Sequence, residues 1–456
     1  MDNLRGRLEP VRQALFGTDG VRGRANIDLT PELALAVGAA SGRVVAGAGG
    51  RAVIGRDTRR SGPMLEAALV AGLTSVGVDV LLAGIVPTPG ISFLIKDERA
   101  QLGVVVSASH NPPEDNGIKL FDEEGLKLTE AAENRIASDL AAPPATRTVE
   151  VGSARELPAA AARYAAFLTG AMETDDVDLS GSTIVVDCAY GATGAIATRV
   201  LEHFHARVIE MHAEPCGERI NEACGVGDVA PLRAAVLAHD AQLGIAFDGD
   251  GDRVLLVTAA GDILDGDSIL GIAAIHQLRE GRLDPRIVVA TVLSNYGLER
   301  GLKERGISLR RTPVGDRHVA REMRATNARL GGEKSGHIIF RDHSSTGDGI
   351  LTAVKLLEVV HETGRSLEDL AREVPLLPQE QRDVPTEDPV ALLARPEVLR
   401  IIDNARTDVG DRGRVLVRAS GTQALLRVMV EAEEPERCLR LCDELVSRLV
   451  AVTQSL

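Results

Sequence analysis

Three aspartates alternate with glycines in one short stretch of the chain. Asp248, Asp250 and Asp252 lie between two apolar runs, 243–247 and 254–257, which we expect to be strands. The intervening glycines let the backbone curl so that the three carboxylates converge. At about 4 Å and an effective dielectric constant of about 20, each carboxylate pair repels by about 4 kcal/mol, so the trio needs a cation or a proton. Oxygen-only ligands favour Mg²⁺, and a solvated acidic turn is the structural alternative.

A loop with two serines and a histidine follows another apolar run, 103–106. Ser107, Ser109 and His110 precede a Pro-Pro pair, which prevents the chain from continuing directly as a helix. Ligands of α/β proteins bind where parallel strands end, so Ser109 or Ser107 is a candidate nucleophile. A serine hydrolase fits poorly, because the chain has no GxSxG segment. A turn with a helix-capping serine is the structural alternative.

Near the C-terminus, small and cationic residues gather in one loop. Arg418, Ser420, Gly421 and Thr422 follow one apolar run, and Arg427 lies in the next. Small residues expose backbone N–H groups, while the hydroxyl and guanidinium groups add donors and charge, a combination suited to a phosphate dianion. A Walker A nucleotide loop is excluded because the chain has no Gly-Lys dipeptide.

Two further segments combine glycine with polar residues. Glu333 and Ser335 are bracketed by glycines just before His337. A carboxylate and a hydroxyl suit vicinal sugar hydroxyls, although an ordinary turn has the same composition. The charged segment 55–59 precedes a helix that we expect Ser61 to cap, so we interpret this segment as a structural network.

These loops need elements that position them, and the sequence predicts strands that alternate with helices. Short β-branched runs are followed repeatedly by Ala/Leu-rich stretches, which is typical of βαβ units with mostly parallel strands. We place domain boundaries near residues 157, 260 and 375. The predicted domains are 1–157 with the serine loop, 158–260 with the aspartate loop, 261–375 with the Glu333 segment, and 376–456 with the phosphate-binding loop.

The last predicted domain differs from the others and is α+β. After a stretch rich in proline and acids, it offers strands at 414–417 and 425–431 and a helix that begins at Pro435. Cys438 and Cys442 share the apolar stripe of this helix. We therefore expect both thiols in the core and not at a metal.

The composition limits the kinds of molecule that the protein can bind. A formal net charge of −15 over 456 residues is a poor match to nucleic acid or to an anionic membrane surface. Aromatic residues make up only 2% and tryptophan is absent, so base-stacking platforms are scarce. Five cysteines without a CxxC pair predict free thiols and a cytoplasmic protein. No apolar run approaches the roughly 18 residues that a membrane helix needs.

Taken together, these loops resemble those of the α-D-phosphohexomutase superfamily, and most closely its bacterial glucosamine branch. The resemblance runs from segment 16–23 to segment 418–422 and covers nearly the whole chain. The serine loop with segment 115–119 behind it, and segments 17–20 and 346–349, favour the glucosamine branch. Five motifs in the same order make the match specific.

The resemblance implies three doubly wound α/β domains and a smaller α+β domain around one cleft. It also implies that Ser109 carries a phosphoryl group and that Asp248, Asp250 and Asp252 hold Mg²⁺ against this group, with the phosphorylated Ser109 as a further metal ligand. The enzyme would be an isomerase that interconverts glucosamine 6-phosphate and glucosamine 1-phosphate, as a supplier of UDP-N-acetylglucosamine and cell-wall precursors. A hexose 1,6-bisphosphate would be both intermediate and activator.

Further roles follow from the resemblance. Phosphoryl transfer depends on positioning and on neutralising oxygen charge, so several cations need to approach the phosphoserine. The sugar hydroxyl must also lose its proton. The implied residues are Arg22, Arg253 and Lys119 at the phosphoserine; Glu333 and Ser335 at the sugar; Arg418, Ser420, Gly421, Thr422 and Arg427 at the other phosphate; and His337, Lys119 and His110 as candidate bases.

Three departures from the glucosamine pattern leave the sugar open. Lys334 stands in place of the usual Gln, Pro313 in place of a frequent Lys, and Gln423-Ala424 in place of Glu-Pro. The nearest competing function is therefore the same chemistry on glucose or mannose phosphate. A phosphatase that works through Ser109 and a catalytically silent sugar-phosphate sensor are compatible with the same loops. The sequence is also compatible with a homodimer.

Overall fold

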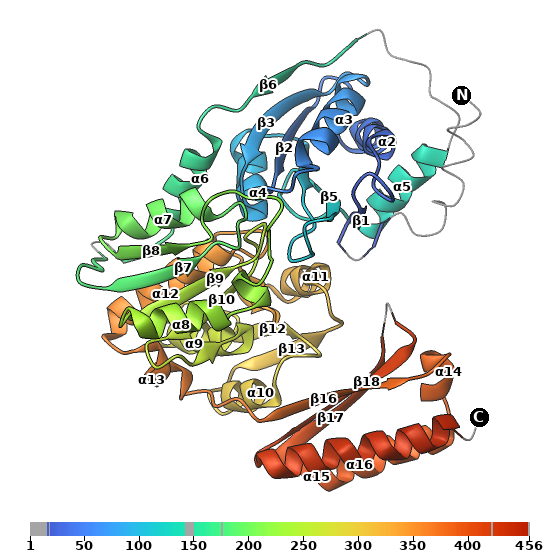
Figure 1. The fold of residues 1–456 in the computed structure, drawn as a ribbon, viewed down its shortest axis with the longest axis vertical. Coiled ribbons are helices and arrows are strands. Elements are labelled where there is room, and N and C mark those ends of the chain that lie inside the picture. Colours follow the sequence, from blue (N-terminus) through green and yellow to red (C-terminus); the bar gives the residue numbers. More distant parts are fainter. Residues whose placement is uncertain (1–15, 18, 142–149, 175–176, 421–422, 455–456) are drawn as a thin grey trace. The chain divides into compact units, whose positions relative to one another are not determined.

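The computed structural model describes residues 16–17, 19–141, 150–174, 177–420 and 423–454, which form two compact units (Figure 1). The larger unit comprises the chain up to residue 293 together with 307–371. The smaller comprises 294–306 together with the chain from residue 372. Four sheets form their frameworks. The predicted class, α/β sheets with a smaller α+β C-terminal domain, is confirmed.

The first sheet has the strand order β1-β5-β4-β2-β3-β6. Its centre is parallel, whereas β5 pairs antiparallel with both β4 and β1. The serine loop therefore connects the buried strand β4 to an antiparallel neighbour. The strands are β1 (Val21–Arg24), β2 (Arg51–Arg56), β3 (Asp79–Ile85), β4 (Leu102–Val106), β5 (Asp115–Phe121) and β6 (Ala154–Glu156).

Helices cover both faces of this sheet. Alternate residues of a strand point to opposite faces, so Ile54 and Val104 pack in one apolar cluster while Val53 and Val105 pack in another. The apolar character of these strands follows from burial on both faces. The helices and helical turns are α2 (Pro31–Ser41), η2 (Gly42–Ala46), α3 (Gly62–Thr74) and α5 (Glu130–Ala141) around the first cluster, and α4 (Thr88–Asp97) and α6 (Ala160–Thr169) around the second.

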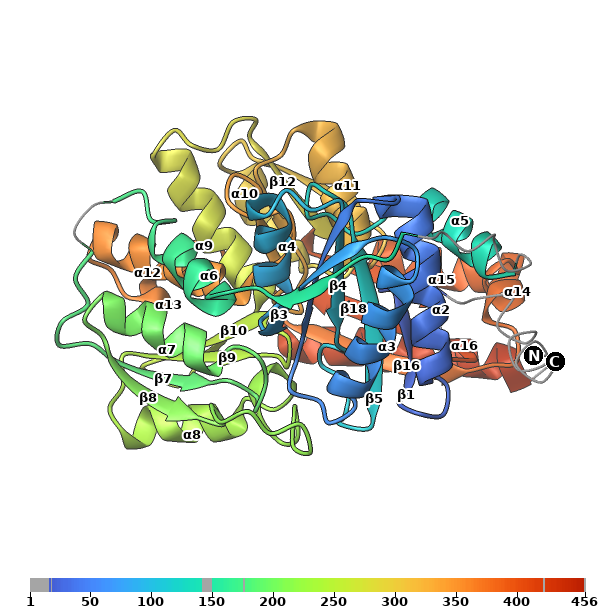
Figure 2. The same ribbon diagram turned by 90° about the horizontal axis from the view of Figure 1, so that it is seen from above.

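The second sheet has the order β11-β10-β9-β7-β8, with α7 and α8 on opposite faces (Figures 1 and 2). Strands β9 and β10 pair antiparallel, with Phe247 opposite Val254. The aspartate loop is therefore the connection of a hairpin. The elements are β7 (Thr183–Asp187), α7 (Gly194–His203), β8 (Arg207–Met211), η3 (Gly225–Gly227), α8 (Ala230–Ala238), β9 (Leu243–Phe247), β10 (Val254–Thr258) and β11 (Ile263–Leu264).

The third sheet has the order β13-β12-β14-β15, and the Glu333 segment joins its antiparallel strands β14 and β15. Val319 and Met323 of α11 pack against Val289 and Ile339 of the sheet. The elements are α9 (Gly266–Arg279), β12 (Ile287–Thr291), β13 (Ser308–Thr312), α11 (Asp316–Thr326), β14 (Leu330–Gly332), β15 (Ile338–Phe340), α12 (Gly349–Thr363) and α13 (Leu367–Ala371).

The smaller unit is an antiparallel sheet, β16-β18-β17, with two long helices along it (Figure 1). Cys438 and Cys442 are fully buried in its core, which confirms the predicted core position of both thiols. The elements are α10 (Tyr296–Lys303), β16 (Gln379–Pro385), α14 (Pro389–Leu393), α15 (Pro396–Val409), η4 (Gly410–Arg412), β17 (Gly413–Ala419), β18 (Leu425–Ala432) and α16 (Pro435–Gln454).

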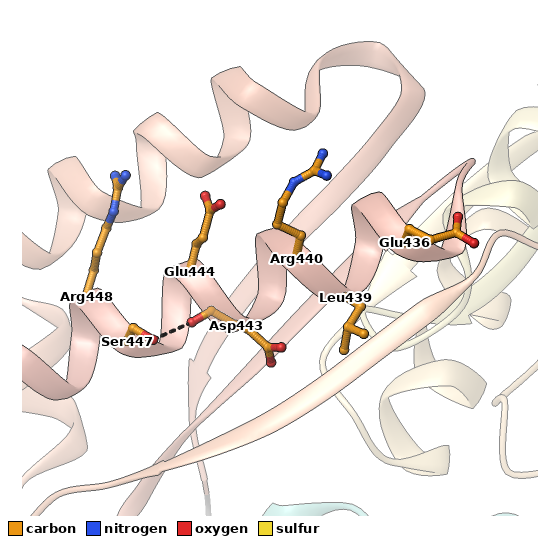
Figure 3. Close-up of a pocket in the computed structure, with 7 residues that line it drawn as sticks. All are labelled: Glu436, Leu439, Arg440, Asp443, Glu444, Ser447 and Arg448. Carbon is orange, nitrogen blue, oxygen red and sulfur yellow. Dashed lines mark hydrogen bonds between the residues drawn. The ribbon is translucent and has the colours of Figure 1, made fainter.

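The outer face of α16 is polar. Figure 3 shows a shallow groove along it, lined mainly by charged side chains. Glu436, Arg440, Glu444 and Arg448 follow one another at four-residue spacing, which places opposite charges on neighbouring turns and supports the helix. Leu439 is exposed beside them. The charged face and the buried cysteine face together explain why this long helix lies on the surface of its sheet.

Ser61 and the cysteines were also subjects of sequence predictions. Ser61 precedes α3 but does not cap it: its backbone is already helical, and its hydroxyl accepts a hydrogen bond from Asn116 Nδ2 at 2.8 Å instead. The prediction of a cap was wrong for this reason. All five cysteines are free, as predicted. No helix in the described ranges combines the length and apolarity that crossing a membrane requires.

Candidate active site

Ser109 follows the last residue of strand β4, Val106, by three positions in the chain and is almost fully buried. Its φ of +52° is in the left-handed region, which turns the side chain away from the direction of the strand. The Ser109 hydroxyl donates to Asp248 Oδ2 over 2.6 Å, and its backbone N–H donates to Ser107 Oγ over 2.9 Å. The structure thus brings Ser109 to the aspartate loop of the second sheet.

A buried ion pair holds the serine loop in this conformation. Arg59 and Asp57 are both inaccessible and lie 3.0 Å apart. Arg59 also donates to the carbonyl oxygens of Ser109 and Asn111 at 2.9 and 2.8 Å. Ser107 Oγ donates to Asp57 over 2.6 Å, so this hydroxyl belongs to the same network. The interpretation of segment 55–59 as structural is confirmed.

The second sheet's domain holds the same loop from the other side. Asn221 Nδ2 donates to the carbonyl oxygens of Ser109 and Asn111, at 2.8 and 3.0 Å. The carbonyls of the serine loop are therefore fixed by one arginine and one asparagine from different domains. Asn221 was not predicted as a site residue, because no local pattern connects position 221 with position 109.

The three aspartates converge as predicted. Each offers an oxygen that lies within 4.8 Å of the others, and all three residues are buried. Burial and the neighbouring charges of Asp252 and Asp250 raise the pKa of Asp248 well above its usual value. Asp250 Oδ1 and Asp252 Oδ1 are buried and accept no hydrogen bond from any described residue. Buried oxygens without donors fit a hard divalent cation.

Lys119 balances part of this charge. The buried Lys119 Nζ lies 2.7 Å from Asp250 Oδ2, 3.3 Å from Asp252 Oδ2 and 3.5 Å from Asp19 Oδ2. Burial alone would lower the lysine pKa, but Asp19, Asp250 and Asp252 outweigh it and hold the pKa well above its usual value. The ammonium group is therefore charged. Thr88 adds a hydroxyl hydrogen bond to Asp250 Oδ2.

A chain of alternating charges continues from Lys119. Asp19 also pairs with Arg22 and with Lys127, and Lys127 in turn pairs with Asp316 of the third sheet's domain. Burial opposes ionisation of Asp19, yet the three cations keep its pKa well below the usual range. Asp19, Lys127 and Asp316 were not among the predicted site residues, although Asp19 lies within segment 16–23, which carries part of the resemblance.

Two further predicted residues lie at the serine loop. Exposed His110 has its Nδ1 3.3 Å from Ser109 Oγ, and partial desolvation with Arg253 and Arg22 nearby lowers its pKa to about 4. Arg22 donates to Asn111 Oδ1 over 3.1 Å. Arg22 and Arg253 each retain a buried Nε–H that makes no hydrogen bond within the described ranges, although Arg253 Nε lies 3.9 Å from Asp252 Oδ1. An anion is the natural partner for such groups.

His337 is buried between two acids. Its Nδ1 lies 3.7 Å from Asp252 Oδ2 and its Nε2 lies 3.7 Å from Asp316 Oδ2, while the N–H of Gly347 donates to Nε2 over 3.0 Å. Burial lowers the histidine pKa, but Asp252, Asp316 and Glu333 reverse the shift and raise it. The structure thus places His337 in contact with the aspartate loop.

The Glu333 segment forms a tight turn. The N–H of Gly315 donates to Glu333 Oε1 over 3.0 Å and orients the half-buried carboxylate, while Ser335 is exposed. Lys334 Nζ lies 3.9 Å from Asp265 Oδ2, at the start of α9. The ammonium of Lys334 is therefore directed to this neighbouring acid.

The predicted phosphate-binding residues lie in the smaller unit. Arg418 and Arg427 stand opposite one another on β17 and β18, and Asp383 of β16, the register partner of Arg427, offsets part of the repulsion between these like charges. Burial and the nearby Arg427 lower the pKa of Arg418. Ser420 follows at the end of β17, whereas Gly421 and Thr422 lie outside the described residues.

Comparison with known proteins identifies the family. Four models of phosphoglucomutase/phosphomannomutase domains match the chain: α/β/α domains I, II and III at 13–146, 162–261 and 265–376, and the C-terminal domain at 381–448. The chain belongs to the phosphoglucomutase/phosphomannomutase family. The predicted superfamily and the predicted enzyme class, an isomerase of the mutase type, are confirmed.

Curated relatives within this family include phosphoglucosamine mutases. The phosphoglucosamine mutase of Mycobacterium ulcerans is 48% identical over 96% of this chain and 99% of its own length, and that of Saccharopolyspora erythraea is 47% identical with the same coverage. Both sequences support the glucosamine branch that the loops predict.

Solved structures share the fold. A phosphoglucomutase/phosphomannomutase family protein of Burkholderia thailandensis matches with a TM-score of 0.79 and 27% identity, over 95% of this chain and 97% of the other. The N-acetylphosphoglucosamine mutase of Aspergillus fumigatus, solved with GlcNAc-6P and magnesium, matches with a TM-score of 0.67 and 18% identity over 96% of both chains.

We predict that Arg59→Met destabilises the larger unit by about 3–5 kcal/mol, because it leaves Asp57 as a buried, unpaired charge. The matched control is Arg60→Met, since Arg60 is 84% exposed and its pair with Glu218 should contribute less than about 1 kcal/mol. Urea unfolding of both variants measures the difference. Equal free energies of unfolding would contradict a structural role for Arg59.

We also predict that Asp250→Asn weakens Mg²⁺ binding at least about tenfold, because it removes one carboxylate of the trio and leaves Lys119 with fewer acids. Isothermal titration calorimetry with MgCl₂ measures this affinity directly. Asp240→Asn is the control, since Asp240 is an exposed aspartate outside the trio. If both variants bind Mg²⁺ like the unaltered protein, the trio is not the metal site.

Proposed function

We propose that this protein interconverts glucosamine 6-phosphate and glucosamine 1-phosphate by transferring a phosphoryl group to and from Ser109. The observation that carries this proposal is the 2.6 Å hydrogen bond between Ser109 Oγ and Asp248, inside a buried group of three carboxylates. A hydroxyl at this position can carry a phosphoryl group against a divalent cation. The curated relatives that are 45–48% identical support the same reaction.

Asp248, Asp250 and Asp252 would hold Mg²⁺, because three carboxylates converge and Asp250 and Asp252 each have a buried oxygen that accepts no hydrogen bond from the described residues. The cation would neutralise negative charge on the phosphoryl group during transfer. The chain supplies the remaining positive charge: Arg22 and Arg253 keep guanidinium N–H groups available for phosphoryl oxygens. We assign both arginines to this role.

The sugar hydroxyl that attacks the phosphoserine must give up its proton. Lys119 is held in its charged form by three acids, so we assign it to charge neutralisation and not to proton transfer. His110 and His337 remain the proposed bases. His110 is neutral near pH 7 and lies at the mouth of the serine loop, while His337 is positioned by Gly347 and two acids.

The sugar would be bound by Glu333 and Ser335. The hydrogen bond from the Gly315 N–H leaves Glu333 Oε2 for a hydroxyl or an amino group of the sugar. Lys334, whose charge would oppose a protonated amino sugar, is directed to Asp265 instead. This departure from the usual pattern is therefore compatible with glucosamine.

We assign the non-transferring phosphate to the smaller unit. The facing pair Arg418 and Arg427 supports this role, because a dianion would relieve the repulsion that Asp383 offsets only in part. Ser420, Gly421 and Thr422 complete the proposed phosphate-binding set by sequence. After the first transfer the sugar carries two phosphates, and exchange of their positions lets the second return to Ser109. Added hexose 1,6-bisphosphate would then activate an unphosphorylated chain, because it can donate a phosphoryl group to Ser109.

We also propose a cytoplasmic location, which the five free cysteines fit.

The choice of sugar is tested by kcat/KM for glucosamine, glucose and mannose 6-phosphates with Mg²⁺ and the bisphosphate present. We expect glucosamine 6-phosphate to have the highest value by at least about tenfold. Glucose or mannose 6-phosphate in first place would replace glucosamine as the substrate, while leaving the phosphoserine chemistry intact.

Ser109→Ala should abolish isomer formation and leave the thermal midpoint within a few degrees, because the hydroxyl carries the phosphoryl group but contributes little to the core. Turnover is measured as glucosamine 1-phosphate formed, with free phosphate measured in parallel. Ser107→Ala is the control and should retain phosphorylation at Ser109, since the Ser107 hydroxyl is bound to Asp57. Activity in Ser109→Ala would move the carrier elsewhere, and free phosphate in excess of isomer would indicate a phosphatase.

A further inference from the structure

A second group of potential metal ligands lies in the second sheet's domain. Asp187 at the end of β7, His212 just after β8 and Cys224 just before η3 each offer a ligand atom within 4.8 Å of the others. Asp187 and Cys224 are fully buried, whereas the His212 side chain is 21% exposed. None of these residues takes part in the proposed phosphoryl transfer.

We propose that Asp187, His212 and Cys224 form a binding site for one Zn²⁺ ion, with water as the fourth ligand. The donor set of one thiolate, one imidazole and one carboxylate suits Zn²⁺, and three protein ligands plus water is a common arrangement. It differs from the aspartate trio, which offers oxygen alone. Zinc bonds of about 2.0–2.3 Å place neighbouring ligands roughly 3.3–3.8 Å apart, so ligand atoms that already lie within 4.8 Å of one another need only small side-chain shifts to reach this spacing.

The local contacts show what holds Asp187 in place and which proton the ion would displace. At present His212 Nδ1 lies 3.0 Å from Asp187 Oδ1, and the backbone N–H groups of Ala189 and Gly225 donate to the two carboxylate oxygens at 3.0 and 2.9 Å. These amides hold Asp187 in place, as outer hydrogen bonds do for metal-binding carboxylates. The ion would replace the Cys224 thiol proton, which leaves to solvent past the partly exposed His212, while the imidazole proton that faces Asp187 moves from Nδ1 to Nε2 so that Nδ1 can bind the ion.

A thiol nucleophile is the other chemistry that a Cys, a His and an Asp side by side suggest. Cys224 is inaccessible to solvent, so no substrate atom reaches its sulfur in this conformation. A metal ion needs only a small opening and binds the sulfur from inside the cluster. The burial of Cys224 therefore favours the metal site.

The position of the site connects it with the serine loop. Cys224 ends the same segment that carries Asn221, whose amide holds the carbonyls of Ser109 and Asn111. Gly225 packs against the carbonyl of Phe247, directly before the aspartate loop. Zinc at Cys224 would fix this segment between both catalytic loops, and we expect it to raise the thermal midpoint.

Cobalt titration of the full-length protein tests the proposal. Co²⁺ replaces Zn²⁺ and gives thiolate-to-metal charge-transfer absorption only when a cysteine is a ligand; excess MgCl₂ keeps the aspartate trio occupied. We expect this absorption to saturate at one Co²⁺ per chain and to disappear when Zn²⁺ is added. His212→Ala, at a partly exposed position, should weaken Co²⁺ binding at least about tenfold.

Two cysteine variants complete the experiment. Cys224→Ser should remove the charge-transfer absorption, whereas Cys216→Ser should retain it, because Cys216 lies outside the cluster. Asp250→Asn should also retain it. Absence of thiolate absorption in the unaltered protein, its persistence in Cys224→Ser, or an unchanged Co²⁺ affinity in His212→Ala overturns the proposal.

Discussion

The strictest condition on this structure is the burial of three aspartates side by side. Carboxylates about 4 Å apart repel one another by about 4 kcal/mol per pair at an effective dielectric constant of about 20, and burial adds the cost of removing them from water. Two features offset this cost for Asp248, Asp250 and Asp252. Lys119 neutralises part of the charge, and the remaining free oxygens are suited to a divalent cation.

The three sheet domains of the larger unit each contribute residues to the group of buried carboxylates. The first sheet's domain contributes Ser109, Lys119 and Thr88, the second contributes the carboxylates, and the third contributes His337. Ser109, the three aspartates and His337 lie in loops at strand ends, Thr88 begins α4, and Lys119 lies within strand β5. The charge chain through Asp19, Lys127 and Asp316 then joins the first and third domains beside the site.

The local sequence pattern was sufficient to predict the serine and aspartate loops. It was insufficient to predict which residues contact them. The serine and aspartate loops were predictable because each follows an apolar strand whose period and length are visible in the sequence. The contact of Asn221 with Ser109 joins positions 112 residues apart, and nothing near either residue indicates it. The direction of Lys334 also depended on Asp265, a residue on another element. Ser61 failed as a predicted cap because Asn116, far along the chain, engages its hydroxyl.

The central claim is that the Ser109 hydroxyl, and no other, carries phosphorus. Peptide mapping by mass spectrometry after incubation with hexose 1,6-bisphosphate and Mg²⁺ tests this claim most directly. The account predicts a single phosphoryl adduct on the peptide that contains residues 107–110, with fragment ions that assign it to Ser109. An adduct on Ser107 or on another peptide, or no adduct in a preparation that forms isomer, would contradict it.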